Sequence, residues 1–331
     1  MTTRRQAEDD EAARRAVDER DADKLNELGQ RAGDDGDLAA AVGFFRASMV
    51  LGGDGAAHNL GVVLAELHRY AAASEAFRVA AERGVEDARL NRANLLSDHL
   101  DRPAEAEREY LTLVASGDVR AMFNLGLLYL ELGRDDDAVA MFREASGRGD
   151  AEASERLAGL LAEAGAEDEA VIAYELAIGQ GDGGARVALA RHLARRGDVD
   201  GARAAFERAV GDGVEEAANS FGAWLVAQGL DAEAEALYRS ALAGGDRSVW
   251  RNLGNVLADD ATRREEALTA YLNAIAAGDA EAWASIGVLL AEHGQLEEAA
   301  EVLEQAAADG DPLAREALPG IRQQLRQAGP G

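Results

Sequence analysis

The sequence of 331 residues contains no cysteine, only four prolines, and a single lysine, Lys24, among its 34 basic residues. The absence of cysteine excludes disulfide bonds and thiolate chemistry. Few prolines and no alternating runs of Val, Ile or Thr argue against β-strands. Aromatic residues make up only 5 %, so the apolar residues are mainly Ala and Leu, which favour helices. The composition therefore predicts an all-α protein, and the excess of Arg over Lys is typical of a GC-rich bacterial genome.

Positive charge is also scarce, because the formal net charge is -28. Binding to nucleic acids or to an anionic membrane surface requires positive charge that neutralises phosphates. The balance therefore argues against nucleic-acid and membrane partners. No apolar run reaches the roughly 18 residues of a membrane span. The first residues carry charges where a signal peptide would be apolar, so we expect a cytoplasmic protein.

Glycines recur along the chain at intervals of 32 or 33 residues: Gly52, Gly84, Gly117, Gly149, Gly181, Gly213, Gly245, Gly278 and Gly310. A degenerate repeat starting near residue 20 precedes them. A period of this length predicts stacked supersecondary repeats. We therefore divide the chain into a charged N-terminal lead (1–19), nine repeats (20–309, starting near 20, 52, 84, 117, 149, 181, 213, 245 and 278), and a C-terminal capping helix and tail (310–331).

Each repeat has the pattern of a helix, a tight turn and a second helix. In residues 117–148, apolar or small residues lie at helical spacing on both sides of Gly133, which suits the left-handed turn that ends a helix. Asp118 follows the opening glycine, where its carboxylate can cap the next helix. Short amphipathic helices are unstable alone, so stacking of about nine repeats into a solenoid is expected.

Two further features concern the ends and the longer repeats. The two 33-residue repeats are expected to carry their extra residue between their helices, within 97–106 and 258–267, because loops tolerate insertions.

Pro312 follows Gly310 and Asp311 at the position that favours proline, the start of a helix. Pro319 is expected to break or kink this last helix.

These residues resemble the tetratricopeptide repeat. The match is carried by Leu125, Gly126, Tyr129, Ala138, Phe142 and Ala145, and it recurs in other repeats, as in Leu60, Gly61, Ala73, Phe77 and Ala80. The turn between repeats (144–153) instead resembles that of the SEL-one-like repeat. The resemblance implies a right-handed superhelical solenoid whose first helices line a concave face that binds peptides. Gly126 lacks a side chain, so a neighbouring helix can approach closely there.

The sequence offers no catalytic constellation. The five histidines are scattered, and neither a Walker pattern nor an HExxH or G-x-S-x-G motif occurs. The glycines are explained by helix ends. We therefore expect neither an enzyme nor a cofactor or metal site.

Asparagines recur on the face that the resemblance assigns to the groove. Positions are counted from the opening glycine of each repeat. Position 8 is an asparagine in four repeats, and position 11 in two: Asn59, Asn91, Asn124 and Asn252 at position 8, and Asn94 and Asn255 at position 11. The amide of asparagine can both donate to and accept from a peptide backbone. Peptide-binding members of the family use such a ladder, but asparagine here is also common family consensus, and both explanations remain open.

Arginines replace the asparagines in the middle of the array. Arg120, Arg156, Arg191 and Arg195 occupy groove positions, and residues 186–208 hold six arginines against three acidic residues. Arginine binds carboxylates through two parallel hydrogen bonds. These residues could receive an acidic side chain or a free C-terminus, or they could pair with acidic residues of neighbouring repeats.

Together these features predict a non-enzymatic adaptor that binds a partner peptide or helix in a concave groove. Two alternatives remain: a self-assembling structural protein, and a regulatory module of a separately encoded enzyme. The sequence leaves the partner and the oligomeric state open, because repeat scaffolds serve many functions.

Overall fold

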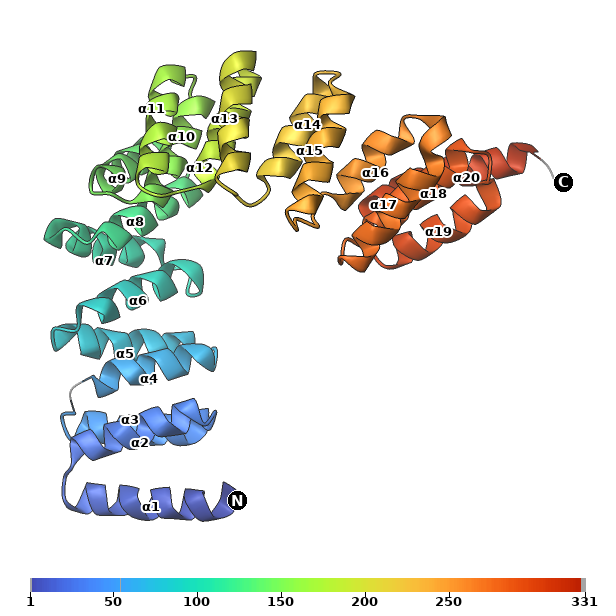
Figure 1. Ribbon diagram of the computed structural model, residues 1–331. Helices are drawn as coiled ribbons and strands as arrows, with labels where there is room; N and C mark the ends of the chain where they lie inside the picture. The colour runs from blue at the N-terminus through green and yellow to red at the C-terminus, as the bar shows by residue number, and fades with distance from the viewer. Residues whose placement is uncertain (1, 54, 329–331) are drawn as a thin grey trace. The chain divides into compact units, whose positions relative to one another are not determined.

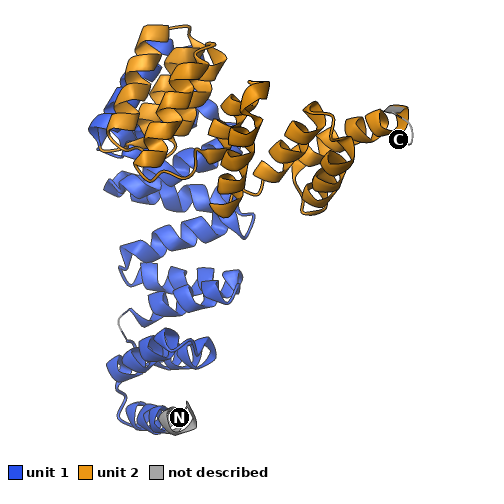
Figure 2. Ribbon diagram, turned by 45° about the vertical axis from the view of Figure 1, so that its right-hand side comes forward, with its two compact units in different colours: residues 1–180 blue, residues 181–331 orange. Residues whose placement is uncertain are grey.

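The computed structural model describes residues 2–53 and 55–328, and throughout these residues it contains helices and no β-strand (Figure 1). The helices form two compact units, unit 1 with residues 1–180 and unit 2 with residues 181–331 (Figure 2). The all-α, repeating helix-turn-helix fold class expected from the sequence is confirmed.

Unit 1 begins with one long helix and continues with five helix pairs. Residues of the charged lead form α1 (Thr2–Asp18). The pairs are α2 (Ala22–Asp34) with α3 (Leu38–Val50), α4 (Ala56–Glu66) with α5 (Tyr70–Glu82), α6 (Glu86–Asp98) with α7 (Pro103–Ser116), α8 (Val119–Glu131) with α9 (Asp135–Gly147), and α10 (Ala151–Glu163) with α11 (Glu167–Gly179). Each helix packs mainly against its neighbours in the chain, as in a solenoid.

Unit 2 contains four helix pairs and a last helix. The pairs are α12 (Gly184–Arg195) with α13 (Val199–Gly211), α14 (Ala217–Ala227) with α15 (Asp231–Ala243), α16 (Trp250–Ala258) with α17 (Arg264–Ala276), and α18 (Ala282–Glu292) with α19 (Leu296–Ala308). The last helix, α20 (Pro312–Ala328), packs on α18 and α19. It is continuous through Pro319, which lies inside it, so the expected break does not occur.

In the repeat of residues 117–148, the glycine turns and the aspartate cap lie where the sequence predicts them. Gly133 has φ +69° in the turn between α8 and α9, and Gly117 has φ +91° between α7 and α8. Asp118 then accepts hydrogen bonds from the backbone N–H groups of Arg120 and Ala121 at the start of α8. The two longer loops also lie within the repeats. The chain between α6 and α7 ends at Pro103, and the 3-10 helix η1 (Ala261–Arg263) precedes α17.

Glycines of the first helices lie against large side chains of the second helices. A Cβ atom on Gly126 would lie 2.7 Å from the ring of Phe142, which is fully buried. Equivalent close approaches join Gly61 to Phe77, Gly222 to Tyr238, Gly254 to Tyr271 and Gly287 to Leu303. The close approach expected at Gly126 is therefore present, and it recurs in both units.

Two of these side chains make the stability of unit 2 sensitive to alkaline pH. Burial raises the pKa of Tyr238 to about 12, and burial together with nearby carboxylates raises that of Tyr271 to about 12. In the unfolded chain both groups lose their protons near pH 10. The free energy of unfolding should therefore fall as pH rises from about 10 to about 12.

The double variant Tyr238→Phe, Tyr271→Phe tests this expectation, because it cannot ionise at either position. Chemical unfolding followed by circular dichroism at pH 7 and pH 11 should show a smaller alkaline loss of stability for the variant than for the parent chain. An equal loss in both proteins would contradict the assignment to these two tyrosines.

Candidate functional site

Three of the asparagines singled out by the sequence bond to an asparagine of the preceding repeat. In each bond Nδ2 donates to Oδ1: Asn59 to Asn26 (3.1 Å), Asn124 to Asn94 (2.9 Å) and Asn252 to Asn219 (2.8 Å). The bonds join first helices of adjacent repeats, α2 with α4, α6 with α8, and α14 with α16. These asparagines therefore hold neighbouring repeats in register, and each still has hydrogen-bonding capacity left over.

The other predicted asparagines differ among themselves. Oδ1 of Asn94 also accepts from the Tyr110 hydroxyl at 2.7 Å, and Oδ1 of Asn255 accepts from the Tyr271 hydroxyl at 3.0 Å. Both bonds join the two helices of one repeat. Asn91 is half-buried on α6 and forms no side-chain hydrogen bond with any residue that the structure describes. The structure thus joins Asn124 to Asn94, one turn beyond Asn91.

The four predicted arginines are also in different situations. Arg120 bonds to Asp87 of the preceding repeat at 2.9 Å and to Asp118 at 3.1 Å, which is the pairing that the sequence left open as an alternative. Arg156 and Arg195 are exposed and form no ion pair with the described residues. Arg191 is exposed and donates from a terminal nitrogen to the hydroxyl of Ser220 at 2.6 Å. Its charge is not balanced by an ion pair within residues 2–53 and 55–328.

Arg191 contrasts with many other arginines, which bridge adjacent repeats. Arg134 lies 2.9 Å from Glu107, and Arg263 lies 2.7 Å from Glu235. Hydrogen bonding from Arg263 holds the pKa of the Glu235 carboxyl below its usual range. Both pairs remain in contact with water, which screens them, so each stabilises the fold only weakly. They show that many arginines in this acidic chain are already used between repeats.

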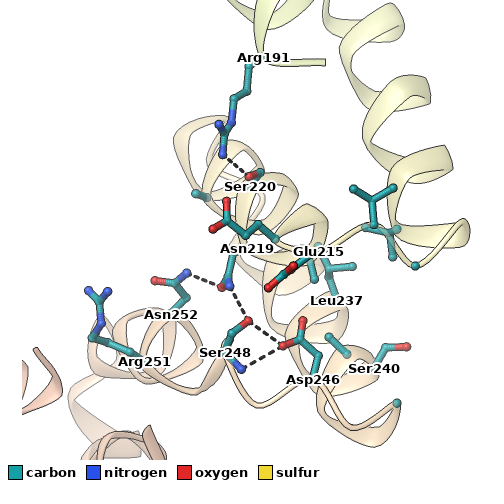
Figure 3. A pocket seen from close by; sticks show the side chains of 18 residues that line it. Arg191, Glu215, Asn219, Ser220, Leu237, Ser240, Asp246, Ser248, Arg251 and Asn252 are labelled. Carbon is teal, nitrogen blue, oxygen red and sulfur yellow. Dashed lines mark hydrogen bonds between the residues drawn. The ribbon is translucent and has the colours of Figure 1, made fainter. Parts of the chain in front are cut away.

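A hollow of about 980 Å³ lies beside Arg191 in unit 2. We call it the Arg191 hollow. It lies between α12, α14, α15 and the start of α16, and its polar lining includes Arg191, Glu215, Asn219, Ser220, Asp246, Ser248, Arg251 and Asn252. Figure 3 shows a hydrogen-bonded chain along its wall, in which Asn252 donates to Asn219, Asn219 to Ser248 (2.7 Å), and Ser248 to Asp246 (2.6 Å).

Two more hollows continue from the Arg191 hollow along the first helices. The middle hollow, of about 240 Å³, is lined by Ala223, Val226, Tyr238, Asn252, Asn255, Val256 and Asp259. The α18–α20 hollow, of about 540 Å³, is lined by Arg251, Asn255, Ala258, Asp259, Tyr271, Ala284, Ser285, Val288, Leu289, Glu292, Leu313, Glu316 and Ala317. Ala223 and Asn252 are common to the first and second hollows, and Asn255 and Asp259 to the second and third. Because adjacent hollows share lining residues, we consider the three together and call them the unit-2 groove.

The structure thus brings Arg191, Asn252 and Asn255 into one groove. Sequence reasoning missed Asn219, Ser220 and Ser248, which complete the wall of the Arg191 hollow. Asn219 stands at position 7 of its repeat, next to position 8 where asparagine recurs, so the sequence held an indication of its place in the groove.

The described part of the chain contains no group of three or more His, Cys, Asp or Glu residues placed to hold a metal ion. Nor is any helix among the described residues long and apolar enough to cross a membrane. The residues that line the unit-2 groove present hydrogen-bonding groups, charges and apolar surface.

The sequence model described as "Tetratricopeptide repeat" matches residues 90–149, 136–185, 187–249 and 251–314, about two thirds of the chain. The chain belongs to the tetratricopeptide repeat family. The matches begin at residue 90, yet the pairs α2–α3 and α4–α5 precede them with the same glycine-to-phenylalanine contacts, at Gly29 with Phe45 and Gly61 with Phe77. No curated protein is similar enough in sequence to match the chain.

Several solved structures of helical-repeat proteins are similar to this chain, one of them with a TM-score above 0.5. A Sel1 repeat protein from Oxalobacter formigenes is 19 % identical with a TM-score of 0.55, over 93 % of this chain and 89 % of that one. A tetratricopeptide repeat protein from Parabacteroides merdae is 21 % identical with a TM-score of 0.45, over 67 % and 92 %. Yeast Tom70 is 12 % identical with a TM-score of 0.49, over 92 % and 96 %. The likeness to the Sel1 repeat protein agrees with the SEL-one-like turns seen in the sequence.

Proposed function

We propose that this tetratricopeptide repeat protein is a non-enzymatic scaffold that holds a segment of a partner protein in the unit-2 groove. The tetratricopeptide fold is generally one of protein–protein interaction. The observation that carries the proposal is the continuity of the three hollows along α14, α16 and α18, with asparagine side chains at each junction. A continuous groove accommodates a peptide or a helix, whereas an isolated pocket accommodates a small molecule.

Asn252 and Asn255 offer complementary groups to a peptide backbone. Asn252 uses Nδ2 to bond to Asn219, which leaves its Oδ1 as an acceptor. Asn255 uses Oδ1 to accept from Tyr271, which leaves both Nδ2 hydrogens as donors. The two residues are three apart on α16 and share one helix face. An acceptor beside a donor suits the N–H and C=O groups of an extended chain, whatever its side chains.

The charge of Arg191 supplies a second contact. Its present partner, the Ser220 hydroxyl, is neutral, so an incoming carboxylate can replace it with a stronger, charge-assisted bond. Arg195 follows one turn later on α12 and adds positive charge. We therefore propose that an acidic side chain or a free C-terminus of the partner binds at this end of the groove.

The test is a selection of peptides from a random display library on the full chain, followed by affinity measurement. The variant Asn252→Ala, Asn255→Ala should bind the selected peptides roughly tenfold more weakly, because two neutral hydrogen bonds are lost. Asn273→Ala is the matched control, since Asn273 lies on α17 and lines none of the three hollows. Unchanged affinity in the double variant, with its fold intact by circular dichroism, would show that the groove is not the site.

A further inference from the structure

Two large aliphatic side chains are exposed inside the α18–α20 hollow. Val288 of α18 is 40 % exposed and Leu313 of α20 is 48 % exposed. Ala284, Leu289 and Ala317 add further apolar lining to the same space of about 540 Å³. Single exposed aliphatic residues are ordinary on a protein surface, but two that line one concave space form a receptor for an apolar side chain.

Carboxylates surround this apolar lining. Asp259, Glu292 and Glu316 line the hollow, and all three are exposed. They come from the end of α16, the end of α18 and the first half of α20. None of them forms an ion pair with a residue that the structure describes. Their charge is therefore available to a basic group brought in from outside.

Arg251 does not neutralise these carboxylates, although it also lines the hollow. Its guanidinium bonds to Asp279 at 2.7 Å and to Glu281 at 2.9 Å. The negative charge also reaches Tyr271, another lining residue. Burial raises the pKa of Tyr271 to about 12, and the carboxylates Glu292 and Asp259 add to this rise. The hollow thus combines an apolar interior with a negative potential at its edge.

We propose that the α18–α20 hollow binds an aliphatic side chain of the partner segment that is flanked by lysine or arginine. This inference rests on the proposed use of the unit-2 groove and adds the chemistry that it selects at the α20 end. The aliphatic side chain packs on Val288 and Leu313, while the neighbouring cations meet Asp259, Glu292 and Glu316. Charge complementarity decides the class of ligand, because an acidic segment would be repelled here.

The experiment uses the full chain and short fluorescein-labelled peptides of Gly, Ser and Ala with a central Lys-Leu-Lys, Lys-Ala-Lys or Glu-Leu-Glu. Fluorescence anisotropy at low salt should show that the Lys-Leu-Lys peptide binds roughly tenfold more tightly than either of the others, because it alone satisfies both the apolar and the charged groups. Equal binding of Lys-Leu-Lys and Lys-Ala-Lys would overturn the apolar part of the proposal.

Matched variants locate the binding. Leu313→Ser should remove most of the preference for leucine, whereas Leu272→Ser on α17, equally exposed at 48 % but outside the hollow, should not. The triple variant Asp259→Asn, Glu292→Gln, Glu316→Gln should weaken Lys-Leu-Lys binding roughly fivefold. The control Glu297→Gln, Glu298→Gln, Glu301→Gln on α19 changes the net charge by the same amount and should have little effect. Equal effects of the two triple variants would indicate non-specific attraction and overturn the proposal.

Two outcomes separate this inference from the proposed function. In the first outcome, Asn252→Ala, Asn255→Ala weakens binding of the library peptides, while the α18–α20 variants bind Lys-Leu-Lys as the parent does. Peptide binding in the unit-2 groove is then supported, and the inference about the α18–α20 hollow fails. If Leu313→Ser abolishes Lys-Leu-Lys binding while the asparagine variant binds library peptides normally, the inference stands and the backbone-binding proposal fails. The hollow could instead be occupied by a second copy of the chain, and light scattering tests this. If the parent chain were a dimer and Leu313→Ser a monomer, the hollow would be assigned to the contact between two copies, and the proposal would be overturned.

Discussion

Replacing Gly126 by leucine is expected to lower the melting temperature of unit 1 by several degrees. The close contact with Phe142 explains why, since even a Cβ atom on Gly126 would lie 2.7 Å from that ring. Phe142 is completely buried, so the ring has no free space into which to move. Overpacking of this kind costs about 1–3 kcal/mol, and in a domain of this size each kcal/mol corresponds to roughly 2–4 °C.

Gly147→Leu is the matched control for this prediction. Gly147 lies in α9, and a Cβ atom there would meet nothing within 4 Å. Because glycine is a poor helix former, this substitution should leave stability unchanged or raise it by up to about 1 kcal/mol. Thermal unfolding followed by circular dichroism compares the two variants. Equal melting temperatures would show that the contact between Gly126 and Phe142 does not constrain the packing of α8 on α9.

Exchanging Arg191 and Arg195 for glutamate should weaken binding of acidic or C-terminal peptide segments by about tenfold to a hundredfold. Among the described residues, the guanidinium of Arg191 bonds only to the neutral Ser220 hydroxyl. The exchange therefore removes a charge-assisted bond to the ligand and introduces repulsion. The affinity of peptides from the display selection, measured by isothermal titration calorimetry, provides the test. The loss should shrink as salt is added, because both arginines are exposed.

Single variants show whether the hollow or the overall charge is responsible. Arg191→Glu should account for most of the loss, because Arg191 lines the Arg191 hollow and Arg195 does not. Arg208→Glu makes the same charge change on α13, where the exposed side chain lines none of the three hollows. If Arg208→Glu weakened binding as much as Arg191→Glu, the effect would be one of net charge and the proposed carboxylate contact would be wrong.

The sequence could not decide whether an arginine at a predicted groove position pairs with an acidic residue of a neighbouring repeat or keeps its charge for a ligand. Arg120 and Arg191 both occupy predicted groove positions in an acidic chain. Arg120 lies within reach of Asp87 on α6 and pairs with it, whereas the residue within reach of Arg191 is Ser220 on α14. The partner of each arginine depends on which residue of the adjacent repeat lies opposite it. Which residues lie opposite each other follows from the packing of helices from adjacent repeats, and no local sequence pattern encodes it.

For the asparagines, too, the sequence shows the positions but not the bonding partners. The sequence placed Asn91 and Asn94 on one helix face, one turn apart, as candidate contacts to a peptide backbone. In the structure Asn124 bonds to Asn94, whose Oδ1 is also fixed by the Tyr110 hydroxyl. Oδ1 of Asn94 thus accepts from a residue of the next repeat and from a residue of the second helix of its own repeat. The recurrence of asparagine was visible in the sequence, but which asparagines pair depends on how the helices pack.

The sequence by itself determined the repeats, their helix pairs and their glycine turns, because these follow from local conformational preferences and from apolar spacing within some 30 residues. The left-handed turn at Gly133 and the close approach at Gly126 are examples. Only the tertiary structure decided where the groove of unit 2 lies and what lines it. Val288 and Leu313 share one hollow with Asp259 because α16, α18 and α20 pack together. Such a meeting of separate helices is fixed by the fit of their side chains across repeats.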